Sequence, residues 1–145
     1  MITLPTDLTP HQLRQIDEAI HKALRPEQVV EWRWCIEDAW GDWLVFDKSI
    51  SPERVLMPTV EIDGRSHILR RYHLPGAAND EVVNALMVHE KGYRDIHLAY
   101  ERLLDGRDYL RADCGVWGGI ASTLPCAYLA CAMDAWGIGI PEAQP

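Results

Sequence analysis

The stretch EWRWCIEDAWGDWLVFD, residues 31–47, contains four of the six tryptophans of the chain: Trp32, Trp34, Trp40 and Trp43. From Val30 to Ile36, large hydrophobic residues alternate with charged or small ones. This period of two predicts a half-buried β-strand. We expect a turn over residues 38–42 and a returning strand over residues 43–46, which together make an antiparallel hairpin. Each tryptophan can bury about 200 Å², so a helix, a second sheet or another copy of the chain must cover one face.

The composition limits the classes of protein that the chain could belong to. It has 145 residues, a net charge of −8 and a pI near 5.1, so we expect one domain over residues 1–145, with a loose tail at about 139–145. An acidic chain lacks the electrostatic attraction that supplies most non-specific DNA affinity, so direct nucleic-acid binding is not expected. We find neither a signal-peptide pattern nor an apolar run long enough to span a membrane, and the four cysteines are expected to be reduced. These features predict a cytoplasmic protein.

Two local signals mark the next elements. Thr9, Pro10 and Gln12 form the start of a helix with a capping box, and Pro26 ends it. Asp63-Gly64 is a preferred pair for a two-residue type I′ turn, and it predicts a second hairpin over residues 59–74. Both faces of the returning arm mix polar and apolar residues, which is typical of an edge strand.

The second half of the chain is predicted to be mainly helical. We expect one long helix from residue 79 to about residue 106, capped by Asn79, with Gly92 at a possible kink. Residues 108–120 are predicted to be irregular, with glycines in tight turns, and a buried helix is expected over residues 125–136. The predicted fold is therefore α+β: an antiparallel sheet of four or more strands, built from two hairpins, packed with about three helices.

Candidate chemistry is sparse. His89-Glu90 starts the HExxH pattern, but Tyr93 replaces the second histidine, and His97 has no third ligand at a suitable spacing, so no metal site is expected. Cys114 lies in a glycine-bearing segment where a nucleophile could be presented, although a buried structural thiol is the favoured interpretation. We expect no cofactor and no catalytic residue.

Three segments together resemble a known family. The residues EWRWCIEDAWGDW, HEKGYRDIHLAYERLL and RADCGVWGG are similar to those of the RsaM family of small bacterial quorum-sensing regulators, and the likeness extends over nearly the whole chain. The resemblance implies a dimeric single domain of unusual α+β topology that restrains acyl-homoserine-lactone production, without enzymatic activity or a DNA-binding motif. It carries no catalytic or ligand residues to this chain.

The contact surface is inferred from the residues alone. Trp40 and Trp43 need not face the core with Trp32 and Trp34, so we expect them in a homodimer interface. The basic cluster of Arg65, Arg70 and Arg71 is either a solvated edge strand or a docking surface for an acidic partner, such as another quorum-sensing protein. Two other functions stay open: a small-molecule sensor with an aromatic pocket, and a thiol-dependent enzyme that uses Cys114.

Overall fold

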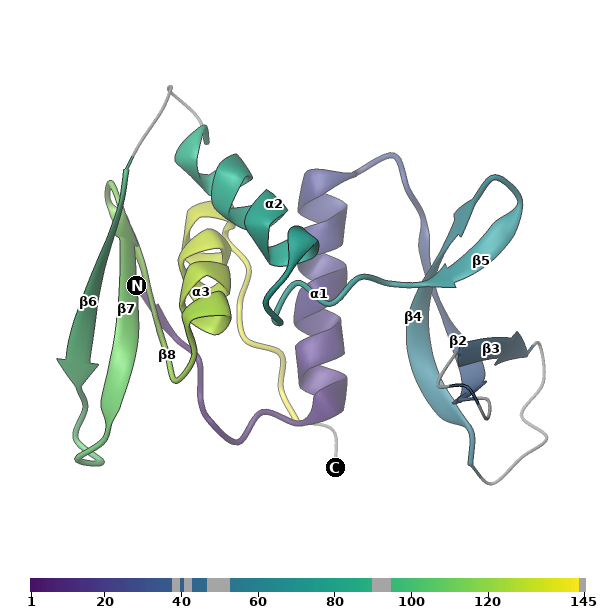
Figure 1. Cartoon of the computed structure of the whole chain (residues 1–145), viewed down its shortest axis with the longest axis horizontal. Helices are drawn as coiled ribbons and strands as arrows, with labels where there is room; N and C mark the ends of the chain where they lie inside the picture. The colour runs from purple at the N-terminus through teal and green to yellow at the C-terminus, as the bar shows by residue number, and fades with distance from the viewer. Residues whose placement is uncertain (38–39, 41–42, 47–52, 90–94, 144–145) are drawn as a thin grey trace.

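Two β-sheets lie at opposite ends of the molecule, with helices α1, α2 and α3 between them (Figure 1). The computed structural model describes residues 1–37, 40, 43–46, 53–89 and 95–143. Within these residues, the sheet orders are β1-β8-β7-β6, here called the core sheet, and β3-β2-β4-β5, here called the hairpin sheet. The chain is a single α+β domain with mostly antiparallel strands, as predicted. The two hairpins predicted from the sequence form the hairpin sheet, whereas the main hydrophobic core lies against the core sheet.

Helix α1, Pro10–Leu24, begins at the predicted residues. The Thr9 hydroxyl accepts from the backbone N–H of Gln12 at 3.1 Å, and the Gln12 side chain accepts from the backbone N–H of Thr9 at 2.9 Å. This reciprocal capping box satisfies two N–H groups that the first turn of a helix leaves unpaired.

The hairpin sheet confirms both predicted hairpins. Its strands are β2 (Val30–Glu37), β3 (Trp43–Phe46), β4 (Val55–Ile62) and β5 (Arg65–Ile68). Asp63 and Gly64 have φ angles of 52° and 78°, as a type I′ turn requires. Strand β5 lies at an edge of the sheet, as expected. Most of the turn between β2 and β3 lies outside the described residues.

Two predicted boundaries in this region are wrong. Strand β4 already begins at Val55, before the expected start of the second hairpin at residue 59. Strand β5 ends at Ile68, so Arg70 and Tyr72 belong to a connection rather than to the strand. After Ile68 the backbone is bound by the buried side chains of Arg14 and Asp17 of α1.

Helix α2 covers Ala77–Met87, so it begins two residues earlier than expected. Its N-cap residue is Gly76, which has no side chain to accept a capping hydrogen bond. Asn79 is therefore not the cap. It lies inside the helix and is buried, and its Nδ2 donates to the carbonyls of Tyr72 and Pro125 at 2.8 and 3.0 Å. These bonds join α2 to the connection that precedes it and to the first turn of α3.

The predicted helix over residues 79–106 is wrong in its second half. Residues 96–102 form strand β6 (Ile96–Arg102), and residues 90–94, which include Gly92, lie outside the described part. The segment predicted to be irregular contains β7 (Asp108–Cys114) and β8 (Trp117–Ala121), which are joined by a two-residue turn with Gly115 at φ 64°. Strand β1 (Ile2–Thr3) completes the core sheet by pairing in parallel with β8.

Helix α3, Leu124–Trp136, is the buried helix that the sequence predicts. It lies directly on β8, and Gly119 allows the contact: a Cβ atom at that position would lie 2.2 Å from the backbone nitrogen of Cys131. Gly119 therefore serves helix–sheet packing inside a strand. A Cβ atom at Gly118 would instead lie 2.6 Å from Asp113 Oδ1, and neither glycine lies in the tight turn that was expected. Trp117 is partly buried and packs against the core.

The main hydrophobic core lies between the core sheet and the three helices. Its fully buried side chains include Ile16 and Ile20 of α1, Leu86 of α2, and Leu129 and Met133 of α3. The residues after Gly139 form no helix or strand in the described part, although the Pro141 carbonyl accepts a 2.8 Å hydrogen bond from Gln12 Nε2. Among the described residues, no helix has the length and apolar character needed to cross a membrane.

Candidate functional site

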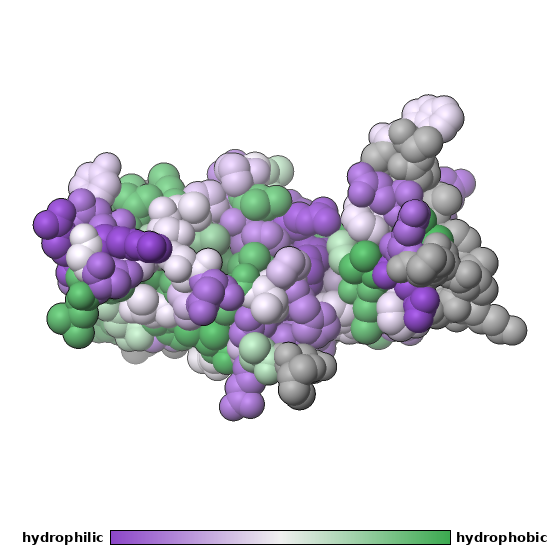
Figure 2. Space-filling view, turned by 90° about the horizontal axis from the view of Figure 1, so that it is seen from below, coloured by the Kyte–Doolittle hydropathy of each residue, from purple (hydrophilic) through white to green (hydrophobic). Residues whose placement is uncertain are grey.

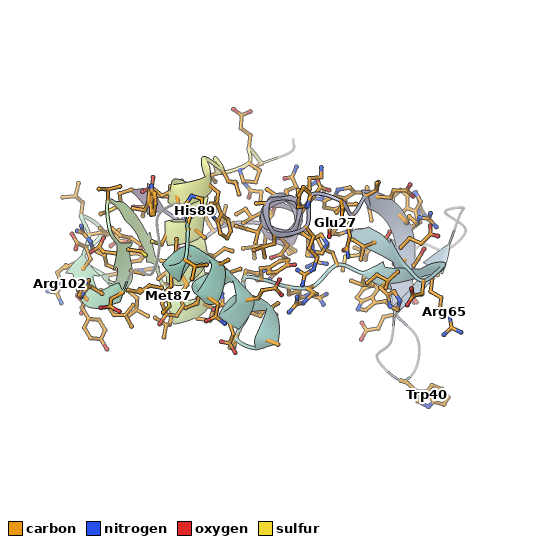
Figure 3. All side chains as sticks on the ribbon, turned by 90° about the horizontal axis from the view of Figure 1, so that it is seen from above. Glu27, Trp40, Arg65, Met87, His89 and Arg102 are labelled. Carbon is orange, nitrogen blue, oxygen red and sulfur yellow. The ribbon has the colours of Figure 1, made fainter. Side chains whose placement is uncertain are left out.

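The five residues expected at a contact surface do not form one patch. Trp40 is 83% exposed and lies with Arg65 at the outer end of the hairpin sheet, where both side chains point away from the helices (Figure 3). Trp43 is half-buried in β3. Trp40 and Arg65 are thus both at the surface, at the same end of the molecule.

Arg70 and Arg71 lie in the connection between β5 and α2. Arg70 pairs with Glu81 of α2, and its guanidinium carbon lies 5.5 Å from the centre of the Tyr72 ring. Arg71 is half-buried. The predicted basic cluster is therefore divided, with Arg65 at the outer end and Arg70 held beside the helices.

Trp32 and Trp34 are half-buried, and polar partners cover them in part. Trp32 lies against α1, where its ring centroid is 4.9 Å from that of His11 and its Nε1 donates to Glu18. Arg54 lies over the ring of Trp34 at 4.8 Å. Trp32 thus joins the hairpin sheet to α1, whereas Trp34 contacts Arg54.

A buried polar network, which the sequence analysis missed, attaches this half of the molecule to α1. Asp17 is 0% exposed and accepts hydrogen bonds from four donors. These are Arg14 Nη1 at 2.7 Å, the backbone N–H groups of Tyr72 and His73 at 2.9 and 3.2 Å, and His73 Nδ1 at 2.8 Å. A carboxylate can be buried only when donors surround it in this way.

Arg14 supplies the second half of the network. It is 5% exposed, and it donates to Asp17 and to the carbonyls of Leu69 and Arg70. Burial lowers the pKa of Arg14, and the neighbouring Asp17 carboxylate opposes that effect. Arg14 and Asp17 together bind both donors and acceptors of the 69–73 backbone, which fixes where this segment leaves the hairpin sheet.

His21 extends the network by one turn of α1. Its Nδ1 lies 2.6 Å from the Tyr72 hydroxyl, and its Nε2 lies 2.8 Å from Gln28 Oε1. A neutral ring satisfies both contacts when Nε2–H donates to Gln28 and Nδ1 accepts from Tyr72. Burial lowers the pKa of His21, as do the charges of Arg25 and Arg70, so the ring is neutral at pH 7.

The spacing of these residues was the only signal for the network in the sequence. Arg14, Asp17 and His21 follow one another at intervals of three and four, which places them on one face of α1 beside Ile16 and Ile20. Polar residues at such a spacing are usually solvated, so the pattern alone does not show that they are buried. Their partners lie about 55 residues away in the chain.

A groove of about 430 Å³ opens beside this network, between the C-terminal end of α1 and the β4–β5 hairpin. We call it the Arg25–Arg70 groove. It is lined by His21, Arg25, Gln28, Val60, Ile62, His67, Ile68 and Arg70. The lining combines two guanidinium groups with three aliphatic side chains, and no tryptophan is among its lining residues.

The candidate chemical residues lie elsewhere. Cys114 is 0% exposed, and its Sγ lies 3.8 Å from the Leu86 carbonyl. Burial raises the pKa of the neighbouring Cys131 thiol to about 12. His89 Nδ1 accepts from Trp136 Nε1 at 3.2 Å, while His97 is exposed on β6. Within the described residues, no three histidine, cysteine or carboxylate side chains are grouped so that they could hold a metal ion.

The core sheet presents a different surface at strand β6. Leu98 is 51% and Tyr100 is 82% exposed, and Leu104 after the strand is fully exposed. Leu98 and Tyr100 lie opposite Ala112 and Leu110 of β7, which face the main core, so they continue the apolar side of the sheet beyond α3. Hydrophobic residues thus reach the surface over both sheets, at opposite ends of the molecule (Figure 2).

Comparison with known proteins gives no match: no family model, curated protein or solved structure is significantly similar to the chain.

Proposed function

We propose that this protein is a non-enzymatic regulator of acyl-homoserine-lactone quorum sensing, which restrains signal production through contacts with other proteins and not through direct DNA binding. The resemblance of its Trp-rich, HEKGYRDIHLAYERLL and RADCGVWGG segments to the RsaM family supports the biological role. The net charge of −8 supports protein contacts over DNA contacts. A cytoplasmic location fits this role.

The observation that carries the proposal is the uncovered apolar surface of β6. In the described part of the chain, β6 pairs only with β7, so its other edge has backbone groups available for a further strand. Exposed edge strands with large hydrophobic residues are a liability unless another chain covers them. An added strand would also cover Leu98 and Tyr100.

A second copy of the chain fits this edge. Antiparallel pairing of two β6 strands around Ala99 places Leu98 opposite Tyr100 of the second copy, and His97 opposite Glu101 of the second copy. The first pair is apolar, and the second joins an imidazole to a carboxylate. The two-fold axis repeats both pairs, as a closed dimer requires. Trp40 and Trp43 are the competing dimer surface, and Trp40 and Arg65 could instead bind an acidic quorum-sensing partner.

The dimer is tested by light scattering on the purified protein. We expect twice the mass of one chain at micromolar concentration, and we expect Tyr100→Lys to give the mass of one chain with an unchanged circular dichroism spectrum. Trp40→Ala is the matched control at the other sheet and should stay dimeric. If Trp40→Ala and not Tyr100→Lys separates the subunits, the interface is at the Trp-rich hairpin.

The regulatory role is tested in the cells that produce the chain. Deletion of its gene should raise the acyl-homoserine lactone in the culture supernatant, and the wild-type gene should lower it again. Cys114→Ser should restore regulation as well as the wild type does, because the thiol is a buried core group. An unchanged signal level after deletion would refute the role, and failure of an abundant, folded Cys114→Ser protein would revive the thiol-dependent enzyme.

A small-molecule sensor is the second candidate, and the Arg25–Arg70 groove favours it. The pocket anticipated for a sensor was aromatic, whereas the groove is basic and aliphatic. This lining suits a ligand with a negative charge and an aliphatic part.

A further inference from the structure

The Arg25–Arg70 groove has a positive end in an otherwise acidic protein. Arg25 Nη1 lies 2.5 Å from Glu81 Oε1, and Arg70 Nη1 pairs with Glu81 Oε2. One carboxylate is thus shared by two guanidinium groups, so these three side chains together carry a net charge of +1. The Glu27 carboxylate also acts on Arg25, as the last and smallest of the influences that raise its pKa. Both arginine side chains are about one third exposed, at 31% and 38%, so a ligand in the groove can reach them.

The protonation states of the neighbouring groups preserve this net charge. Burial opposes ionisation of Glu81, but hydrogen bonds from Arg25 and Arg70 outweigh it and hold the pKa of Glu81 below its usual value. Glu81 is therefore ionised at pH 7 and cancels one charge only. The pKa of His21 is lowered mainly by burial and in part by Arg25 and Arg70, because both arginines disfavour a further positive charge beside them.

The opposite wall of the groove is aliphatic. Val60 and Ile62 of β4 line it together with Ile68 of β5, and Ile62 is 43% exposed. His67, directly across from Val60 in the β4–β5 ladder, adds an exposed imidazole at the hairpin side. The groove thus offers charge at the helix side and apolar surface at the sheet side, which matches a ligand with one charged end.

We propose that the Arg25–Arg70 groove binds a small amphiphilic carboxylate, whose head group contacts Arg25 and Arg70 and whose aliphatic chain lies on Val60, Ile62 and Ile68. The two arginines already bind one carboxylate, that of Glu81, and guanidinium groups suit the planar carboxylate geometry. The volume of about 430 Å³ is within the range of small-ligand sites. This binding is independent of the regulatory role proposed above.

Isothermal titration calorimetry with sodium octanoate tests the assignment. We expect saturable binding of octanoate, and binding at least tenfold weaker for acetate, which lacks the chain, and for 1-octanol, which lacks the charge. Arg70→Gln should weaken octanoate binding at least tenfold. Arg102→Gln is the matched control, because Arg102 is an exposed arginine paired with Asp108 at the other end of the molecule (Figure 3).

A second variant keeps the test decisive if Arg70→Gln disturbs the contact with α2. Ile62 is a partly exposed residue next to the hairpin turn, so Ile62→Asp should leave the fold intact while it places a negative charge on the aliphatic wall. We expect it to abolish octanoate binding. Absence of saturable octanoate binding at millimolar concentration, equal binding of 1-octanol, or binding that Ile62→Asp leaves unchanged would each overturn the proposal.

Discussion

Asp17 shows how much of this structure depends on single side chains. It is fully buried, and its four donors come from α1 and from the 69–73 connection. Because the charge is compensated by Arg14 and by hydrogen bonds, it can remain in the interior. Removal of the charge leaves Arg14 buried without its counter-ion, and a buried unpaired charge is costly.

We expect Asp17→Asn to lower the free energy of unfolding by about 3–5 kcal/mol, the usual cost of breaking a buried ion pair. Urea denaturation followed by tryptophan fluorescence measures the change. Asp108→Asn is the control, since the Asp108–Arg102 pair is exposed and should contribute about 1 kcal/mol or less. Equal effects of the two substitutions would show that the Asp17 network does not stabilise the fold.

His21 makes the stability depend on pH. Its pKa in the folded protein is lowered by burial and by the charges of Arg25 and Arg70, whereas Gln28 and Glu81 act in the opposite direction. The unfolded chain therefore binds a proton more readily, so the stabilisation is complete above the unfolded pKa of about 6.5 and is lost as pH falls toward the folded value. We expect His21→Gln to flatten the decrease in unfolding free energy below pH 6.5, which for one proton approaches about 1.4 kcal/mol per pH unit. An unchanged slope in this variant would assign the pH dependence to other groups.

At the scale of the elements, local signals predicted some parts well and others not at all. The capping box of α1, the Asp63-Gly64 turn and the apolar α3 each carry their information within a few residues, and all three predictions are confirmed. Strand β6 was mistaken for a helix because Ile96 and Tyr100 are four residues apart, a spacing that suits a helix and one face of a strand equally. Its pairing with β7 decides between them, and that contact is not local.

The candidate site was predictable to a smaller extent. The sequence identified Trp40 and Arg65 as exposed residues of the hairpins, because turns and edge strands are recognisable locally. It could not show that Arg70 leaves the strand to pair with Glu81, or that α1 buries Arg14 and Asp17, since both depend on how the 69–73 backbone crosses α1. The Arg25–Arg70 groove also depends on this crossing of the 69–73 backbone over α1, because the crossing places Arg70 in the groove lining.

The contact between α3 and β8 gives the sharpest test of the packing of elements. We expect Gly119→Ala to lower the free energy of unfolding by about 3 kcal/mol or more, because the new methyl group would overlap backbone atoms of Cys131 and Ala127, and backbone cannot rotate away. Thermal unfolding measures the effect. Gly139→Ala is the control, since nothing lies within 4 Å of that position. A Gly119→Ala protein as stable as the control would mean that α3 does not lie directly on β8.

At the scale of the whole molecule, the two sheets are held to the helices by different forces. The core sheet packs on α3 through the main hydrophobic core. The hairpin sheet is joined through the Trp32 contacts with α1 and through the polar network around Asp17. Burial of apolar surface resists local opening more than a few polar contacts do, so the two halves should differ in stability.

We therefore expect amide hydrogen exchange to be slowest in β7, β8 and α3, at free energies near that of global unfolding, and faster in β2, β4 and β5. Asp17→Asn should accelerate exchange in the 69–73 connection and in the hairpin sheet more than in α3. The amide keeps one acceptor oxygen, but its NH2 group replaces Oδ2, which accepts from Arg14 Nη1 and His73 Nδ1, and so weakens the attachment of this connection to α1. Mass spectrometry of peptic fragments resolves these regions. A uniform acceleration across all elements would instead show that both sheets unfold as one cooperative unit, with the polar network as a part of the common core.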